Sequence, residues 1–185
     1  MKDLVVVLLA ILFSTKLIAG QTGDHNEKMA VVQNSRPGLM NITELNVGFG
    51  LGDTDADFAK RFFGLTSILG YGITRNLHGG IGAGISLYNG GTLVPLFLDL
   101  RYIINLGKIS AYAFGDGGLL FNLAKETGSL RMFVNPGAGL RFKISRDLDA
   151  DFGAGLFLQT TKDQSRDSFI NFKLGMTYLF KNKKN

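Results

Sequence analysis

From residue 38 almost to the end of the chain, apolar side chains recur at every second position. This is the repeat of a β-strand, in which successive side chains point to opposite faces of a sheet. In the clearest segment, 130–144, Met132 and Leu140 belong to the apolar series. Proline cannot donate to a sheet ladder, so a bulge is expected there at Pro136 and Gly137. No long segment has the 3.6-residue period of an amphipathic helix, and the pattern therefore predicts an all-β fold.

The alternating segments are long, and they number eight. They cover residues 39–51, 62–75, 81–88, 94–104, 109–121, 130–144, 148–159 and 170–180. Ordinary strands have about 5 or 6 residues, whereas a tilted strand needs about 9 to 11 to cross a bilayer. Long connections alternate with tight turns, which is typical of outer-membrane barrels. We therefore expect an eight-stranded antiparallel up-and-down transmembrane β-barrel over residues 38–181.

The two faces of these segments differ in charge. One face is almost free of charge, as a lipid-facing surface must be. The other carries mid-strand charges of both signs, with glycines that leave room for long side chains. Eight strands enclose an interior that side chains can fill, and opposite charges there can pair. We predict that a lumen ion-pair network plugs the barrel, formed by Glu44, Asp99, Arg101, Asp116, Arg131, Arg141, Lys143, Asp149, Asp151 and Lys173.

The chain begins with a segment typical of export. Residues 4–13 are apolar throughout, but a helix over them would be only about 15 Å long, half the thickness of a hydrocarbon core of about 30 Å. Small residues at Ala19 and Gly20 provide a cleavage site. This pattern predicts a signal peptide over residues 1–20. A polar, aperiodic stretch at 21–37 indicates a flexible periplasmic lead, and residues 182–185 form a polar tail.

The composition excludes several kinds of site. The chain has no Cys and only two His, His25 and His78, so a disulfide framework, a thiolate metal site and a multi-histidine metal centre are ruled out. We predict no metal and no cofactor. The formal net charge of +5 is dispersed. Because no Lys/Arg-rich patch with interleaved aromatic residues is present, nucleic acid is not an expected partner.

Three strand sequences carry a resemblance to a known family. They are VPLFLDLRY at 94–102, NPGAGLRF at 135–142 and FINFKLGMTY at 169–178. The chain resembles the small eight-stranded outer-membrane β-barrel family of Gram-negative bacteria, most closely the Bacteroidetes-type outer membrane protein beta-barrel domain. The resemblance implies location in the outer membrane, contact with its lipid, and insertion by an assembly machinery that recognises an aromatic residue ending the last strand. Here that residue is Phe180, followed by five polar residues.

Some small outer-membrane barrels are lipid-modifying or proteolytic enzymes, and such chemistry needs a base near a nucleophile or an activated water. His78 and Ser86 are the nearest pair in sequence, but they lie eight positions apart on one extended strand. That separation exceeds about 25 Å at about 3.3 Å per residue. We therefore predict no catalytic residues, and an outer-membrane enzyme remains a lesser alternative.

A soluble exported barrel of the lipocalin type is a second alternative, with a small apolar ligand inside. It would reverse the two faces, and alternation alone does not distinguish inside from outside. Surface recognition through the loops is a third possibility, since Asp53, Asp55 and Asp57 make the first loop acidic. Long strands and a charge-free face with bulky side chains favour the membrane barrel. Its expected role is structural or in surface interaction, without catalysis.

Overall fold

The computed structural model describes residues 38–52, 58, 60–123, 130–160 and 166–180. The predicted signal peptide, periplasmic lead and polar tail lie outside these residues. The described strands are β1 (Leu39–Gly50), β2 (Arg61–Gly72), β3 (Leu77–Tyr88), β4 (Gly91–Asn105), β5 (Ile109–Asn122), β6 (Arg131–Lys143), β7 (Leu148–Thr160) and β8 (Arg166–Leu179). The described part of the chain contains no helix long and apolar enough to cross a membrane.

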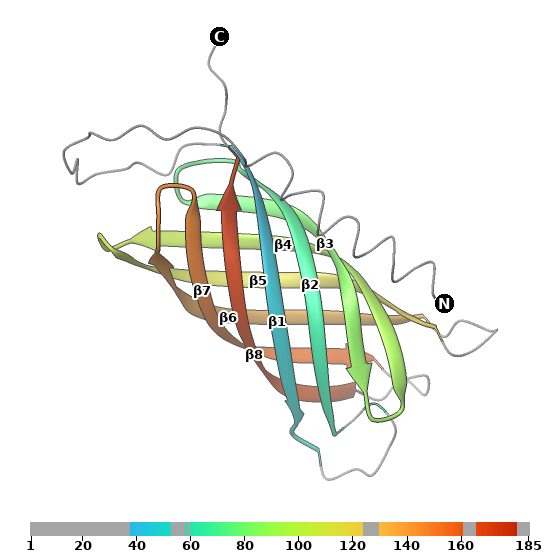
Figure 1. Ribbon diagram of the computed structural model, residues 1–185. Helices are drawn as coiled ribbons and strands as arrows, with labels where there is room; N and C mark the ends of the chain where they lie inside the picture. Colours follow the sequence, from blue (N-terminus) through green and yellow to red (C-terminus); the bar gives the residue numbers. More distant parts are fainter. Residues whose placement is uncertain (1–37, 53–57, 59, 124–129, 161–165, 181–185) are drawn as a thin grey trace. The chain divides into compact units, whose positions relative to one another are not determined.

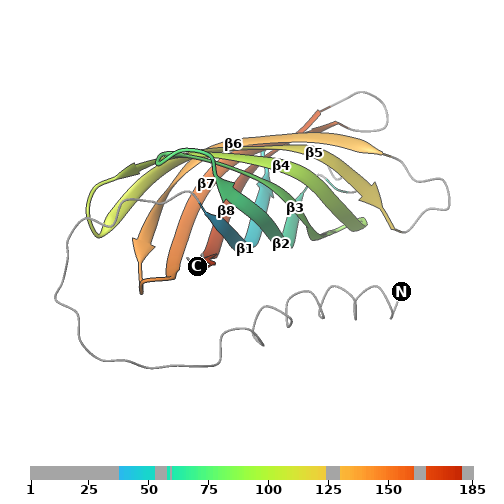
Figure 2. The ribbon, with the colours of Figure 1, turned by 90° about the horizontal axis from the view of Figure 1, so that it is seen from above.

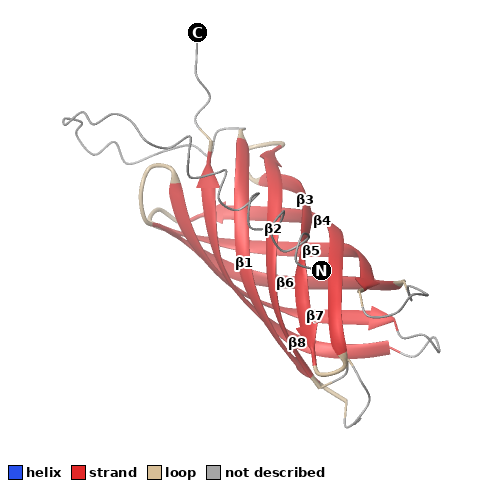
Figure 3. Ribbon diagram, turned by 45° about the vertical axis from the view of Figure 1, so that its right-hand side comes forward, coloured by secondary structure: helices blue, strands red, loops and turns tan. Residues whose placement is uncertain are grey.

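Each strand pairs antiparallel with the next, and β8 pairs with β1, so that the sheet closes on itself (Figure 1). Seen from above, β4, β5 and β6 lie across from β1 and β2 (Figure 2). The strands are tilted, so those on opposite walls run in different directions (Figure 3). The predicted all-β fold, an eight-stranded antiparallel up-and-down barrel, is confirmed.

The two ends of the barrel differ in their connections. We call the end that joins β1 to β2, β3 to β4, β5 to β6 and β7 to β8 the loop rim. The opposite end, which joins β2 to β3, β4 to β5 and β6 to β7, is the turn rim; β1 begins and β8 ends there. The described turns at the turn rim span only three or four residues between strand ends, as the sequence predicted.

The alternating pattern places apolar side chains on the outside of the barrel and both charged and apolar side chains on the inside. Leu98 is 66% exposed whereas its neighbour Asp99 is 4% exposed, and the same contrast recurs along the other strands. A protein in water hides its large apolar side chains, so this distribution fits a barrel whose outer surface meets lipid. The soluble lipocalin-type alternative is wrong, because it requires the charged face outside.

The bulge expected near Pro136 is also wrong. On one side of the proline, Val134 lies opposite Leu158 of β7. On the other side, Gly137 lies opposite Gly155, which is the same register with no inserted residue. The pairing of β6 with β5 is uninterrupted. Proline removes one backbone N–H donor. The gap falls on the side facing β7, where Asn135 and Pro136 have no paired residue, and the strand continues without a shift.

The barrel interior as the candidate functional site

Charged side chains fill the middle of the interior, and five of them form one continuous chain of ion pairs. Glu44 is its centre: Arg101 donates through Nη2 to Oε1 at 2.8 Å, and Lys173 donates through Nζ to Oε2 at 3.0 Å. Arg101 also binds Asp99, with Nε 2.9 Å from Oδ2. Lys173 also binds Asp116, with Nζ 2.6 Å from Oδ2. The chain therefore joins β1, β4, β5 and β8 across the lumen.

A second cluster lies between β6, β7 and β8. Arg141 binds Asp151 through two nitrogens, with Nε 2.6 Å from Oδ1 and Nη2 3.2 Å from Oδ2. Thr177 accepts a hydrogen bond from Arg141 Nη2 at 3.0 Å and donates its own to Asp151. The ring of Tyr112 lies between the clusters, its centroid 5.9 Å from Arg141 Cζ and 5.5 Å from Arg101 Cζ. The side chains of both clusters are buried, and each charge has a partner of opposite sign.

The structure places three residues of the predicted network outside both clusters. Lys143 and Asp149 lie opposite each other on β6 and β7 at the turn rim, where Lys143 is exposed. Arg131 lies at the loop rim, 3.9 Å from Asp167. All three occupy strand ends, where the lumen opens.

A layer of aromatic rings, which the sequence interpretation missed, fills the interior on the loop-rim side. It includes Phe62, Tyr88, Phe97, Phe133, Phe157 and Phe169. Phe133 and Phe157 stack with centroids 4.9 Å apart, and Phe62 lies 5.1 Å from Phe157 and 5.4 Å from Phe169. Phe133 and Phe157 fall on the charged side of the sequence alternation. That position indicates an inward ring, whereas the sequence interpretation fills the lumen with charges alone.

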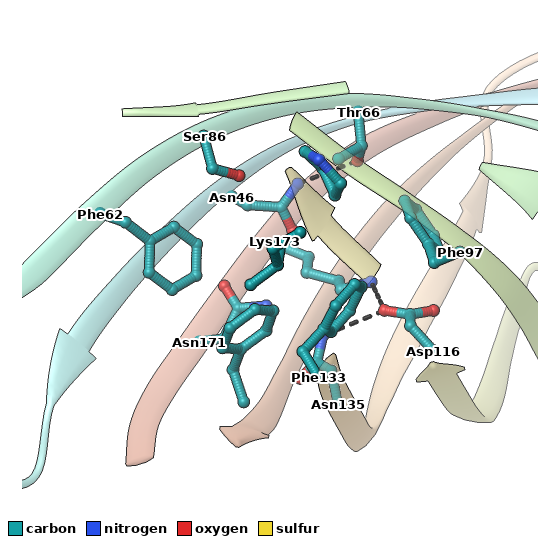
Figure 4. Close-up of a pocket in the computed structure, with 13 residues that line it drawn as sticks. Asn46, Phe62, Thr66, Ser86, Phe97, Asp116, Phe133, Asn135, Asn171 and Lys173 are labelled. Carbon is teal, nitrogen blue, oxygen red and sulfur yellow. Dashed lines mark hydrogen bonds and ion pairs between the residues drawn. The ribbon is translucent and has the colours of Figure 1, made fainter. Parts of the chain in front are cut away.

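A small cavity of about 20 Å³ lies where the aromatic layer meets the ion pairs (Figure 4). Its walls include Asn46, Asn171 and the Lys173 ammonium, together with the ring of Phe97. In Figure 4 the Lys173 ammonium reaches Asp116. The carboxylate of Asp116 also accepts a hydrogen bond from the side-chain amide of Asn135. This volume accommodates about one water molecule.

The remaining candidates for chemistry are far apart. His78 and Ser86 are both buried, but His78 is near the turn-rim end of β3 and Ser86 is near its loop-rim end. In the residues that the structure describes, no group of three or more His, Cys, Asp or Glu side chains could hold a metal ion. The carboxylates of both clusters accept hydrogen bonds from cationic side chains.

No protein-family model and no curated protein matches the chain. Among solved structures, the crystal structure of Neisserial surface protein A matches with a TM-score of 0.58 at 10% identity, over 77% of this chain and 99% of that one. A de novo designed transmembrane β-barrel matches with a TM-score of 0.48 at 13% identity, over 80% of this chain and 100% of the design. The attachment invasion locus protein of Yersinia pestis gives 0.44 at 15% identity, over 78% and 100%. The match to Neisserial surface protein A, together with the closed eight-stranded sheet, shows that the chain has the fold of the small outer-membrane β-barrels.

Proposed function

We propose that this protein is an integral outer-membrane β-barrel with a plugged lumen, whose role is structural or in surface interaction and does not include catalysis. The observation that carries the proposal is the buried chain of ion pairs from Asp99 to Asp116, which crosses the lumen beneath the aromatic layer. The outward-facing Leu, Ile and Phe side chains of the barrel would contact the outer-membrane lipid.

The plug follows from how the two layers complement each other. An eight-stranded barrel is just wide enough for side chains to fill. Here the rings close the loop-rim half, and the paired charges cross the middle. Moving an ion through would require separating buried pairs and exposing unpaired charges, which is costly in a low dielectric. The cavity of about 20 Å³ is far too small for a solute path.

The absence of catalysis is supported by how the polar groups are engaged. A general base needs an available lone pair within reach of a nucleophile or water. Glu44 and Asp151 instead accept hydrogen bonds from buried cations. His78 and Ser86 lie near opposite ends of one strand, so neither can activate the other.

The finer assignments belong to the same proposal. The three strand sequences support a place in the Bacteroidetes-type family, with insertion by the outer-membrane assembly machinery. Phe180 supports the latter, because its backbone N–H donates to Leu39 at 3.0 Å and keeps it aligned with the closing seam. Short connections at the turn rim favour placing that rim in the periplasm.

The test is conductance in planar lipid bilayers. We expect the purified barrel to show no stable porin-sized currents, whereas F62A/F157A/F169A, which removes three rings of the plug, should raise the frequency of openings. The matched control F63A/F152A/F172A removes three lipid-facing rings and should stay silent. Stable large currents from the unaltered protein would overturn the plug, as would equal behaviour of the two triple variants.

A further inference from the structure

Arg131 is a largely buried charge in the barrel mouth whose donors are poorly engaged. It is the first residue of β6, and its side chain is only 11% exposed. Within the described part of the chain, its Nε and Nη1 atoms are buried and have no hydrogen-bond partner. Its ion pair with Asp167 is 3.9 Å long, which is beyond hydrogen-bond distance. By contrast, Arg141 Nε lies 2.6 Å from Oδ1 of its partner Asp151.

The acidic neighbour of Arg131 is held by another group. Gln159 donates through Nε2 to Asp167 Oδ2 at 3.1 Å and also to the carbonyl oxygen of Phe58 at 3.1 Å. Tyr88 donates its hydroxyl to Gln159 Oε1 at 3.2 Å, which fixes the amide. Because this bond network orients Asp167 towards Gln159, the guanidinium lacks the short charge-assisted bonds that a carboxylate normally gives it.

An aromatic ring covers the guanidinium in place of an anion. The centroid of the Phe58 ring lies 4.6 Å from Arg131 Cζ and 5.6 Å from the ring of Tyr88. Phe58 has a φ of 71°, the only positive φ of a non-glycine residue among the described residues. A bulky side chain rarely adopts this backbone conformation, and such outliers gather at ligand-binding and switch positions. The ring is therefore held over Arg131 at a conformational cost.

We propose that the mouth of the barrel at Arg131 is a binding site for an anionic group carried on a flat apolar body, such as an aromatic carboxylate. The anion would accept hydrogen bonds from the guanidinium, whose planar donors suit a carboxylate. The apolar body would take the place of the Phe58 ring beside Tyr88. Both unfavourable features, the buried unpartnered donors and the left-handed Phe58 backbone, would be relieved by binding. This site goes beyond the proposed function, which requires no ligand.

Benzoate is a suitable probe, with benzamide as its neutral counterpart. In an NMR titration of the barrel in detergent micelles, benzoate should shift the Arg131 side-chain N–H signal and nearby amide signals saturably, and benzamide should not. R131Q should weaken benzoate binding by about tenfold or more, since a charged donor is lost. F58A should tighten it, because the covering ring is gone. The matched control R166Q removes an exposed charge from the same rim and should bind as the unaltered protein does.

Two results would overturn the site: no saturable shift with either the unaltered protein or F58A, or benzoate binding by R131Q within about twofold of the unaltered protein. If R131Q fails to fold, R131K replaces it. Lysine keeps the positive charge but loses the planar donors, so it should still weaken binding severalfold. Undiminished binding by R131K would likewise count against the guanidinium. None of these measurements depends on whether the lumen conducts.

Discussion

The charged residues of the two ion-pair clusters are stable in the interior because each has a partner of opposite charge. Glu44 sits between two cations, Arg101 and Lys173, and both of its oxygens accept hydrogen bonds. Removing an isolated charge from water is costly, and a well-formed pair offsets that cost only while both partners remain. Replacing one member should therefore be more harmful than replacing the whole pair with apolar groups.

The pair of Arg141 and Asp151 provides the test at this scale. We expect D151A to lower the free energy of unfolding by about 3–5 kcal/mol, because it leaves a buried guanidinium without its carboxylate. The double variant R141M/D151L should recover most of that loss. Urea unfolding in micelles, followed by circular dichroism, measures both. R75A, at an exposed turn position, should change stability by no more than about 0.5 kcal/mol. A double variant no better than D151A would contradict the argument.

Strands pack closely where glycines on one strand leave room for large side chains of another strand. The rings of Tyr112 and Phe114 on β5 reach over glycines of β6 and β7. A Cβ atom added to Gly139 would overlap the Tyr112 ring and a backbone oxygen of β7, whereas one added to Gly115 would meet nothing within 4 Å. Glycine is thus required by close approach at the inward position only.

This difference gives a matched pair of variants. G139A should lower the free energy of unfolding by about 1–3 kcal/mol, as overpacking of a filled interior does. G115A adds the same methyl group on the lipid-facing side and should be neutral within about 0.5 kcal/mol. The same urea titration compares them. Equal losses for the two variants would show that strand propensity, and not the contact with Tyr112, determines the need for glycine.

The molecule as a whole depends on the seam where β8 meets β1. Eleven residue pairs close it, from Met40 opposite Leu179 to Gly50 opposite Phe169. A closed sheet has no free edge, which is what allows β-structure to exist in a bilayer. Beyond the Met40–Leu179 pair, at the turn rim, the Phe180 ring packs edge-on against Tyr178, with centroids 5.4 Å apart.

We expect F180S to lower the fraction of protein that closes in the outer membrane by at least about twofold, because the outward aromatic residue ending the last strand is lost. The measurement is the fraction of protein in membrane extracts whose gel band shifts on boiling. F142S is the matched control: Phe142 is 39% exposed and Phe180 is 37% exposed, but Phe142 is not on the last strand. A similar loss in F142S would assign the effect to lipid contact alone.

Much of this fold could be predicted from the sequence, because a period of two assigns each side chain to one of two faces. The number of strands, their length and the lipid-facing series came from that rule. The rule also placed Asp99 and Arg101 on the inner face. The alternation holds at Pro136 as well, and the wrong prediction there was the bulge, which was inferred from the missing donor. The uninterrupted ladder on the other side of the strand absorbs the loss without a shift.

What the sequence by itself determined is therefore which side chains enter the barrel, and the tertiary structure alone decided which of them meet. Glu44 and Lys173 are 129 positions apart, and they pair only because the closed, staggered sheet brings β1 beside β8. The same closure separates the interior into an aromatic layer and an ion-pair layer and leaves Arg131 at the mouth. Alternation is a local property of the backbone, whereas contact across a lumen depends on strand tilt and stagger, which no short segment encodes.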